Sequence, residues 1–328
     1  MLKVLLLGIG RWGSNHLRVA RQLAIELFVA DPADAALAAA RKAGVPADHL
    51  SSDPFAFKSA IDAVAIATPA QSHFDLCRGF LAAGKDVFVE KPITLRASEA
   101  LELARMAASR RLVLQVGHIF RFDKASQWLR QAIAEGQFGE VRLLRGCFSG
   151  FKRPRTDTGV MFADTIHFVD LFNFILDCSP SRILAVTRDF FARGMEDEAV
   201  VLLDYPGTHS AVLARVEAGY HLPGKFREVI VVGDRLSAIC DFNVAQYKIR
   251  TFENLHVLKD GNLSAVEGAT HQLEFSPEEP LLAEWHAFIE SVSTRQPPLA
   301  DGRAGYDSVR IIEAALESAR AGRAIELD

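Results

Sequence analysis

The sequence has little of what marks several classes of protein. Its four cysteines are scattered and none forms a CxxC pair, which argues against a disulfide framework and against a zinc site built on cysteine pairs. No stretch approaches the roughly 18 apolar residues that a membrane-spanning helix needs. The opening run MLKVLLLGIG is too short for a signal peptide and leads directly into a glycine turn, which indicates a first β-strand. These absences predict a soluble, cytoplasmic protein.

The chain also lacks a strong excess of charge of either sign. Lys and Arg total 37 against 41 Asp and Glu, so the formal net charge is −4 in 328 residues. Such a balance shows no electrostatic footprint for nucleic acid. With 49% apolar and 24% charged residues, the composition is that of an ordinary globular protein, and the length suits two domains that each bury a core.

A glycine motif stands out near the N-terminus. Gly8, Gly10 and Gly13 form the pattern G-x-G-x-x-G between an apolar segment and a helical one. The first glycine permits a tight turn, the second lets a pyrophosphate approach the backbone, and the third lets helix and strand pack closely. The pyrophosphate would then accept hydrogen bonds from the free N–H groups at the helix N-terminus. The motif therefore predicts a dinucleotide site.

The next apolar segment, IELFVAD, ends at Asp31. It lies about 20 residues beyond the glycines, where an acidic side chain can accept hydrogen bonds from ribose hydroxyls. Its charge would repel a 2′-phosphate and no arginine follows it closely, which favours NAD and leaves NADP open. The alternative is that Asp31 is only a turn or cap residue before Pro32.

Strand-like and helical segments then alternate up to residue 121. Strict alternation predicts a doubly wound parallel α/β sheet, a Rossmann fold, over residues 1–121. Ligands bind such sheets outside the carboxyl ends of the strands. The segments TPAQSH, EKP and GHIFRF all fall at that edge, beside the glycine turn. The last strand of the alternation is expected over residues 112–122.

These segments together resemble a known family. The glycine motif, ATPAQSH, AGKDVFVEKPIT and VGHIFRFDKA are similar to the glucose–fructose oxidoreductase/inositol dehydrogenase/MocA family, along essentially the whole chain. GIGRWGSNHLRVARQL and FKRPRTDTGVMFADTIH are most similar to its nucleotide-sugar branch, which includes UDP-N-acetylglucosamine 3-dehydrogenase-like enzymes. The resemblance implies an NAD(P)-dependent oxidoreductase acting on CH–OH groups.

The resemblance assigns roles to individual residues. Lys91 of EKP would lie beside the nicotinamide and stabilise the charge that develops on the reacting oxygen, instead of being a solvated lysine at a strand end. His118 and Arg121 would line the floor of the substrate pocket, with an ordinary polar pair as the alternative. His73 has a structural role at a helix N-terminus as its alternative. The residues expected to contact the cofactor are Gly8, Gly10, Arg11, Trp12, Gly13, Asp31, Thr68, Pro69, His73, Glu90 and Lys91.

The order of the expected elements changes after residue 121. β-rich segments follow one another through short turns, with no helical crossover among the later ones, which predicts a mainly antiparallel sheet. A helix around residues 162–176 and the C-terminal helices can cover one face of that sheet. We therefore predict an α+β domain over residues 122–328, and the resemblance implies that the open face of the sheet builds a homodimer or homotetramer.

The stretch FADTIHFVDLF places three polar residues in an apolar run. In the family this helix carries D-x-x-x-H-x-x-D, with the histidine as general acid/base, and His167 and Asp170 match that pattern. Ala163 stands where the first aspartate would be, and the acidic residue is Asp164 instead. Since a helix rotates about 100° per residue, the role of Asp164 in substrate binding is in doubt. A histidine that merely pairs with Asp170 is the alternative, and the spacing does not suggest a metal site.

The loop FKRPRTDTG lies just before this helix. Its basic side chains could bind the diphosphate of a nucleotide-sugar, with a solvated loop as an equal alternative. Arg155 and Asp157 fit the branch pattern and are, with Asp164 and Asp170, the predicted substrate-binding residues of this region.

The sequence thus predicts an oxidoreductase that moves hydride between NAD and a secondary alcohol or ketone of a sugar or nucleotide-sugar. Lys91 would polarise the oxygen and His167 would take or return the proton. A cyclitol dehydrogenase and a keto-sugar reductase on the same scaffold are alternatives. A non-catalytic dinucleotide-binding regulator is the alternative from another class.

Overall fold

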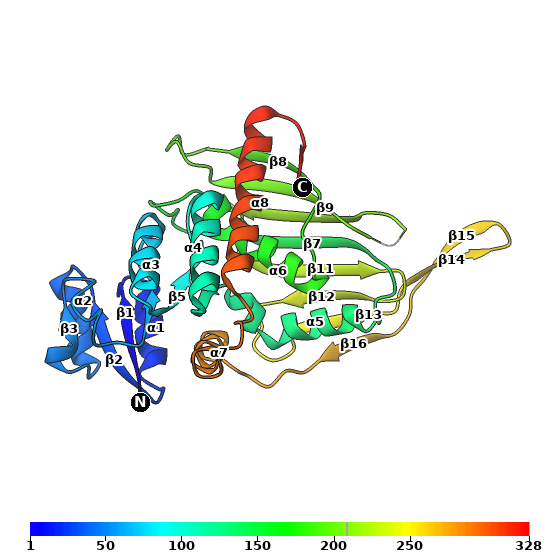
Figure 1. Cartoon of the computed structure of the whole chain (residues 1–328). Helices are drawn as coiled ribbons and strands as arrows, with labels where there is room; N and C mark the ends of the chain where they lie inside the picture. The colour runs from blue at the N-terminus through cyan, green and yellow to red at the C-terminus, as the bar shows by residue number, and fades with distance from the viewer. Residues whose placement is uncertain (208, 328) are drawn as a thin grey trace. The chain divides into compact units, whose positions relative to one another are not determined.

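The computed structural model describes residues 1–207 and 209–327. The chain divides into two compact units, each coloured along the chain in Figure 1. The first unit comprises Met1–Phe122 and Glu279–Val309, and the second comprises Asp123–Glu278 and the segment from Arg310 onward. The functional division into residues 1–121 and 122–328 remains a prediction. Within the described residues, no helix is long and apolar enough to span a membrane.

A six-stranded parallel sheet organises the first unit. Its strand order is β3-β2-β1-β4-β5-β6, and each neighbouring pair is parallel. The strands are β1 (Leu2–Leu7), β2 (Ile25–Ala30), β3 (Leu50–Ser51), β4 (Ala63–Ile66), β5 (Asp86–Glu90) and β6 (Leu114–Gly117). This confirms the predicted Rossmann fold. Because the strand order reverses between β1 and β4, the carboxyl ends of these two strands mark the expected ligand position.

Helices follow the strands of this unit as the alternation predicts. They are α1 (Gly13–Ala20), α2 (Asp34–Lys42), α3 (His73–Ala82), α4 (Ala97–Arg110) and α7 (Pro280–Thr294), with short 3-10 turns η1 (Ala47–His49), η2 (Ala70–Ser72) and η3 (Ile119–Phe122). Trp285 and Phe288 of α7 are fully buried in one core with β1, β2 and β4. A helix from far along the sequence thereby completes the core of this unit.

The predicted strand over 112–122 is wrong at its carboxyl end. β6 ends at Gly117 and the chain turns at once into η3. The N–H of His118 donates to the carbonyl of Val116, and that of Arg121 to the carbonyl of His118. These local bonds divert the backbone from the sheet, so His118 and Arg121 lie on a turn and not on a strand.

A nine-stranded mixed sheet organises the second unit. Its order is β16-β13-β12-β11-β7-β10-β9-β8-β17, and only the β7–β10 pair is parallel. The strands are β7 (Val141–Gly150), β8 (Arg182–Arg188), β9 (Glu198–Tyr205), β10 (Val212–Gly219), β11 (Lys225–Gly233), β12 (Ser237–Asp241), β13 (Ile249–Phe252), β16 (Thr270–Leu273) and β17 (Ile325–Glu326). This confirms the predicted, mainly antiparallel sheet. The sequence patterns did not indicate β16, β17 or the hairpin of β14 (Leu255–Lys259) and β15 (Asn262–Val266), which extends beyond β13 and β16 in Figure 1.

Helices cover one face of this sheet. α5 (Lys124–Ala134) packs on α6 (Ile166–Leu176), and α6 packs on β7 and β10. Gly146 of β7 permits this approach, because a Cβ there would lie 2.8 Å from the Phe168 ring and 3.1 Å from that of Phe172. A single π-helical turn, η4 (Met161–Thr165), leads into α6. α8 (Gly302–Ala321) contributes residues to both units.

Candidate active site

The turn after β1 contains three glycines, which differ in what a side chain would contact at each position. Gly8 has φ +83°, and a Cβ there would lie 2.9 Å from the carbonyl oxygen of Ala67. A Cβ on Gly13 would lie 2.0 Å from the carbonyl oxygen of Gly8, so only glycine lets α1 begin this close to β1. A Cβ on Gly10 would meet nothing within 4 Å. The fold therefore requires Gly8 and Gly13, whereas Gly10 leaves the open space that a dinucleotide phosphate needs.

Asp31 follows β2 and holds the same turn. Its carboxylate accepts hydrogen bonds from the backbone N–H of Ile9 at 2.7 Å and from that of Ala33 at 2.8 Å. One side chain thus fixes both the glycine turn and the entry to α2. A carboxylate has about four lone-pair sites, so the predicted bonds to ribose hydroxyls are compatible with this role and remain a prediction.

Glu90, at the carboxyl end of β5, is the centre of a buried hydrogen-bond network. Its Oε1 accepts from the indole N–H of Trp12 at 2.6 Å and lies 2.8 Å from His16 Nε2, while its Oε2 accepts from the backbone N–H of Lys91 at 3.2 Å. Gly117 makes room for it, since a Cβ there would lie 2.8 Å from the carboxylate. Trp12 belongs to the glycine turn, so the network ties that turn to the EKP segment.

Burial alone would raise the pKa of the Glu90 carboxyl. Hydrogen bonds from His16 and Trp12, together with the nearby Lys91, outweigh burial and hold this pKa below its ordinary value. The carboxylate is therefore ionised at neutral pH, one residue before the predicted catalytic lysine. The Lys91–Pro92 peptide bond is cis.

His73, the first residue of α3, is buried and bridges two loops. Its Nδ1 lies 2.8 Å from the carbonyl oxygen of Pro92, and its Nε2 lies 2.9 Å from that of Thr68. The Thr68 hydroxyl in turn lies 2.7 Å from the hydroxyl of Ser72. His73 therefore connects the segment after β4 to the EKP segment, which is the structural role that the sequence left as its alternative; a cofactor contact stays a prediction.

His118 and Arg121 lie on the turn after β6 in this unit. His118 is buried, and the Arg121 guanidinium donates to the carbonyl oxygen of Leu299 at 2.9 Å. This bond anchors the segment that precedes α8. Their predicted place in a substrate pocket stays a prediction.

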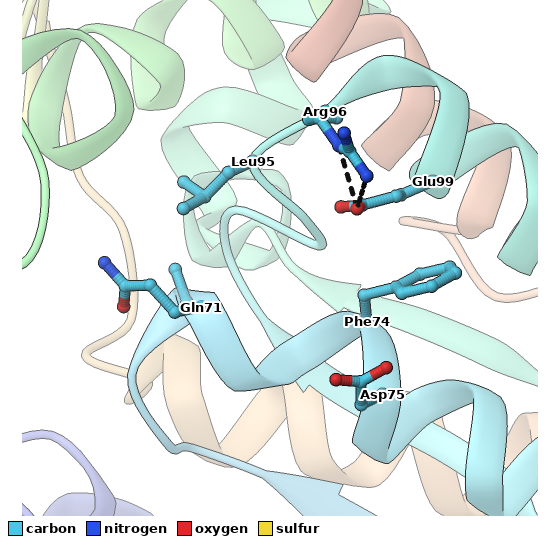
Figure 2. A pocket seen from close by; sticks show the side chains of 7 residues that line it. Gln71, Phe74, Asp75, Leu95, Arg96 and Glu99 are labelled. Carbon is cyan, nitrogen blue, oxygen red and sulfur yellow. Dashed lines mark hydrogen bonds and ion pairs between the residues drawn. The ribbon is translucent and has the colours of Figure 1, made fainter.

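A surface pocket of about 460 Å³ lies between the starts of α3 and α4. Figure 2 shows it, with the Arg96 guanidinium bonded to the Glu99 carboxylate. The residues that line it are Ala70, Gln71, Phe74, Asp75, Leu95, Arg96 and Glu99. None of the predicted site residues is among them, although Ala70 directly follows Pro69 and Phe74 directly follows His73.

The second unit holds the remaining predicted residues on and before α6. The carboxylate of Glu196 accepts from the N–H of Met161 at 3.1 Å and so supports the start of the π-helical turn. Asp164 is on this turn, and its Oδ2 accepts from the Lys152 ammonium at 2.6 Å. The helix there is not a regular α-helix, so the expected rotation of 100° per residue does not hold at Asp164. His167 and Asp170 follow on α6, and Asp170 is buried.

Two aromatic rings lie beside the Lys152 ammonium of the Lys152–Asp164 pair. The Lys152 ammonium lies 5.0 Å from the centroid of the Phe148 ring and 5.3 Å from that of the Tyr220 ring. The Phe148 ring also stacks on the His167 imidazole, at 5.0 Å and 20°, and carries the Arg227 guanidinium at 3.5 Å. We call Phe148, Lys152, Asp164, His167, Tyr220 and Arg227 the α6 cluster.

Burial shifts the pKa of two groups of the α6 cluster, and the charge of Asp164 acts on both. Burial lowers the pKa of the Arg227 guanidinium, and Asp164 opposes that shift. Burial, then Asp164, raises the pKa of the Tyr220 phenol well above its ordinary value, so the phenol stays protonated. Sequence reasoning missed Phe148, Tyr220 and Arg227, which come from β7, the segment after β10, and β11. Their spacing carries no local signal, because only the sheet brings them together.

The other predicted substrate residues pair with each other. The Arg155 guanidinium binds the Asp157 carboxylate through two hydrogen bonds, from Nε at 2.8 Å and from Nη2 at 2.5 Å. The hydrogen bonds to Asp157 raise the pKa of this guanidinium, so it stays charged. Arg193 donates to the carbonyl oxygen of Arg155 at 2.6 Å. Two cations of the basic loop, Lys152 and Arg155, are therefore already matched by carboxylates.

The structure thus brings the predicted residues together in two groups. In the first unit, Gly8, Gly10, Trp12, Asp31, Glu90 and Lys91 gather through the glycine turn and the ends of β2 and β5. In the second, Asp164 and His167 share the α6 cluster, and Arg155 joins Asp157. Within residues 1–207 and 209–327, no three His, Cys, Asp or Glu side chains are placed to hold a metal ion.

A parallel sheet whose strand order reverses beside a G-x-G-x-x-G turn, followed by a large mixed sheet, is typical of a dinucleotide-dependent oxidoreductase. Comparison with family models agrees with this class. The model described as "Oxidoreductase family, NAD-binding Rossmann fold" matches residues 2–118, and "Oxidoreductase family, C-terminal alpha/beta domain" matches residues 130–327. The chain belongs to the Gfo/Idh/MocA family, and its first part is an NAD-binding domain.

Individual relatives agree with this family. A UDP-N-acetylglucosamine 3-dehydrogenase of Acidithiobacillus ferrooxidans is 28% identical over 78% of this chain and 77% of its own. An inositol 2-dehydrogenase of Rhizobium meliloti is 34% identical over 58% of this chain and 60% of its own. Among solved structures, the Acidithiobacillus enzyme superposes with a TM-score of 0.84 over 98% of both chains at 24% identity, which shows the fold alone.

Proposed function

We propose that this protein transfers hydride between NAD and a secondary alcohol or ketone of a sugar or nucleotide-sugar. The observation that carries the proposal is the Trp12–Glu90 hydrogen bond, which holds the EKP segment against the glycine turn. It supports a place for Lys91 beside the reactive end of the cofactor. NAD held at Gly10 and Asp31 would supply the acceptor for the hydride of the carbinol carbon.

We propose that two residues of this chain handle the oxygen and its proton. The Lys91 ammonium donates a hydrogen bond to the reacting oxygen and stabilises its developing negative charge. The His167 imidazole takes the hydroxyl proton as the carbon is oxidised and returns it in the reverse reaction. Imidazole suits this task because its ordinary pKa is close to neutral. Asp170 and Asp164 are proposed to contact the substrate or to orient groups that do.

Asp31 supports NAD as the preferred cofactor. Its carboxylate is fixed by the N–H groups of Ile9 and Ala33, so it cannot turn away from a 2′-phosphate without loosening the glycine turn. We therefore propose NAD over NADP. A D-xylose 1-dehydrogenase of Haloferax volcanii, 26% identical over 89% of both chains, is named for NADP(+), so NADP remains the comparison to make.

The proposed substrate class rests on the α6 cluster and on the loop of residues 151–159, which we call the basic loop. Lys152, Arg155, Arg193 and Arg227 lie in a region that also holds the carboxylates of Asp157, Asp164 and Glu196. Guanidinium and ammonium groups are suited to an anionic substrate such as a nucleotide-sugar diphosphate. An inositol-type cyclitol is the second candidate, supported by the named activity of the Rhizobium relative.

We also propose a homodimer or homotetramer formed through the large sheet. The residues Leu143, Leu184, Val186, Val200 and Leu213 are each more than a third exposed. The strand registers place them on one face. An exposed apolar face of this kind is typical of a protein–protein interface. A cytoplasmic location remains a prediction from the sequence.

The experiment is a substrate panel followed by absorbance of the reduced nicotinamide. Purified protein with NAD receives UDP-N-acetylglucosamine, its uronic acid, myo-inositol or a free hexose. We expect NADH to form with a nucleotide-sugar. Turnover of myo-inositol alone would favour the cyclitol alternative, and tight NAD binding without turnover on a wide panel would favour the regulator. Repeating the productive reaction with NADP tests the role of Asp31.

A further inference from the structure

His16, on α1, occupies the middle of a chain of buried side chains. Its Nδ1 lies 3.1 Å from the indole nitrogen of Trp285, and its Nε2 lies 2.8 Å from Glu90 Oε1. His16 is 1% exposed and Trp285 is fully buried. The sequence suggested neither residue for the site, since Trp285 lies on α7 near the other end of the chain.

The partners of His16 determine which ring nitrogen carries the proton. The indole N–H of Trp285 can only donate, so His16 Nδ1 must accept. Nε2 therefore carries the hydrogen and donates to the Glu90 carboxylate, which can only accept while it is ionised. A histidine with a free choice of tautomer would hold this donor for only part of the time. Trp285 removes that choice.

The Glu90 carboxylate is the point where four elements meet. It faces Trp12 of the glycine turn, His16 of α1, Lys91 on its own strand end and Gly117 of β6. The charged group beside it is Lys91, and the titratable group that donates to it is His16, which is neutral in the tautomer that Trp285 selects. Without the bond from His16, burial would work against the negative charge, because removing a carboxylate from water without donors is costly.

We infer that His16, held in one tautomer by Trp285, is a positioning residue that keeps the Glu90 carboxylate ionised and oriented between Trp12 and Lys91. The inference rests on the proposed function, in that Lys91 is the group whose electrostatic surroundings Glu90 sets. It adds two buried residues, His16 and Trp285, to those that the sequence predicted for the site. It also gives α7 a role in the chemistry besides its role in the core.

The first test compares His16→Leu with His16→Gln. Leucine removes both bonds, whereas the glutamine amide can accept from Trp285 and donate to Glu90. In H16L the acidic limb of the kcat profile, where activity falls with falling pH, should move upward by about one pH unit or more, since a hydrogen bond to a charged group contributes that much. At neutral pH kcat should stay close to that of the parent protein, because a rise of about one unit leaves Glu90 ionised there, and KM for the sugar should change little. H16Q should restore most of the profile.

His49→Leu is the matched control. His49 lies on η1 in the same unit and its Nδ1 is 3.1 Å from the carbonyl oxygen of Leu27. H49L should leave the profile unchanged. An unshifted profile in folded H16L, or equal impairment of H16Q and H16L, would overturn the inference.

A second measurement needs no turnover. With ¹⁵N-labelled histidine, long-range ¹H–¹⁵N correlation should show the Nε2–H tautomer for His16, and Trp285→Phe should give a mixture. With ¹³C-labelled glutamate carboxyl groups, the Glu90 titration should move to higher pH in H16L. Another tautomer, or an unchanged titration, sinks the inference even if sugars turn over. A shifted titration in a protein that oxidises no sugar would instead leave the inference standing and reject the proposed function.

Discussion

The two units hold their predicted residues by different means. In the first unit, backbone groups hold several of these side chains. Asp31 accepts hydrogen bonds from the N–H groups of Ile9 and Ala33, and His73 lies between the carbonyls of Thr68 and Pro92. In the second unit, other side chains hold them, as in the Lys152–Asp164 pair. Backbone positions follow from motif spacing, whereas side-chain partners from distant strands do not. The difference explains why motif spacing indicated the position of Asp31, whereas Phe148, Tyr220 and Arg227 could not be found from the sequence.

The electrostatics of the two sites differ as well. The network in the first unit centres on one carboxylate surrounded by donors, with the pKa of Glu90 held low. The α6 cluster centres on cations lying over aromatic rings. An N–H-rich turn suits a dinucleotide pyrophosphate, and guanidinium and ammonium groups suit an anionic sugar derivative. Each site can be perturbed separately, which allows sharp tests of this comparison.

The largest expected effect comes from the two proposed catalytic residues, one in each unit. Lys91→Ala should lower kcat by roughly 10²–10³-fold, because it removes a donor to the charged oxygen. His167→Asn should lower kcat by roughly 10²–10⁴-fold through loss of the general base. Steady-state kinetics over a pH series measures both effects, and fluorescence titration should show NAD binding within a few-fold of the parent protein in each variant.

The two variants should respond differently to pH. K91A should be slow throughout, whereas H167N should recover partly at high pH, where hydroxide can replace the base. A turnover number unchanged across pH in H167N, together with inactive K91A, would refute the role of His167. Normal turnover in K91A together with inactive H167N would mean that a group other than Lys91 stabilises the charge on the reacting oxygen.

A second prediction compares two glycines of one turn. Gly13→Ala should destabilise the first unit by about 1–3 kcal/mol or more, because its Cβ would lie 2.0 Å from the carbonyl oxygen of Gly8. Gly10→Ala should leave the free energy of unfolding nearly unchanged, since its Cβ meets nothing within 4 Å, while NAD binding weakens. Urea unfolding and NAD titration of both variants check this. Normal NAD affinity in G10A would contradict a pyrophosphate at this glycine.

Much of this architecture could be predicted because it depends on local patterns. The parallel sheet, the position of Asp31 after β2 and the mainly antiparallel second sheet follow from periodicity and turn residues. The strand end at Gly117 could not be predicted, because the apolar pattern continues through Ile119 and Phe120 and carries no sign of the local backbone bonds that turn the chain into η3. The π-helical turn at Asp164 depends on Glu196, a residue 35 positions from Met161. His16 and Trp285 were missed for the same reason, because only the folded core brings α1 and α7 together.

A third prediction concerns the ion pair that the sequence did not foresee. Lys152→Met leaves the Asp164 carboxylate, whose side chain is 10% exposed, without its cation. We expect a loss of about 1–3 kcal/mol, the cost of an unmatched buried polar group. The double variant with Asp164→Asn should recover part of this loss, and the cycle gives the coupling energy. Additive effects would show that the pair contributes nothing to stability. NAD affinity should stay unchanged in all three variants, because both residues belong to the second unit.

The smallest expected effect separates stability from substrate recognition at Arg155. Its side chain is 49% exposed, so the pair with Asp157 should contribute about 0–1 kcal/mol to the free energy of unfolding. Arg155→Ala should therefore unfold almost like the parent protein. If this guanidinium binds a diphosphate, KM for a nucleotide-sugar should rise about tenfold or more, as for other charge-assisted hydrogen bonds, while KM for a free polyol stays the same.

Arg155→Lys keeps the charge and loses the bidentate geometry, so an intermediate KM would point to bidentate binding. An equal rise for both substrates would instead mean that Arg155 only shapes the loop, and the case for a nucleotide-sugar would then rest on Lys152 and Arg227.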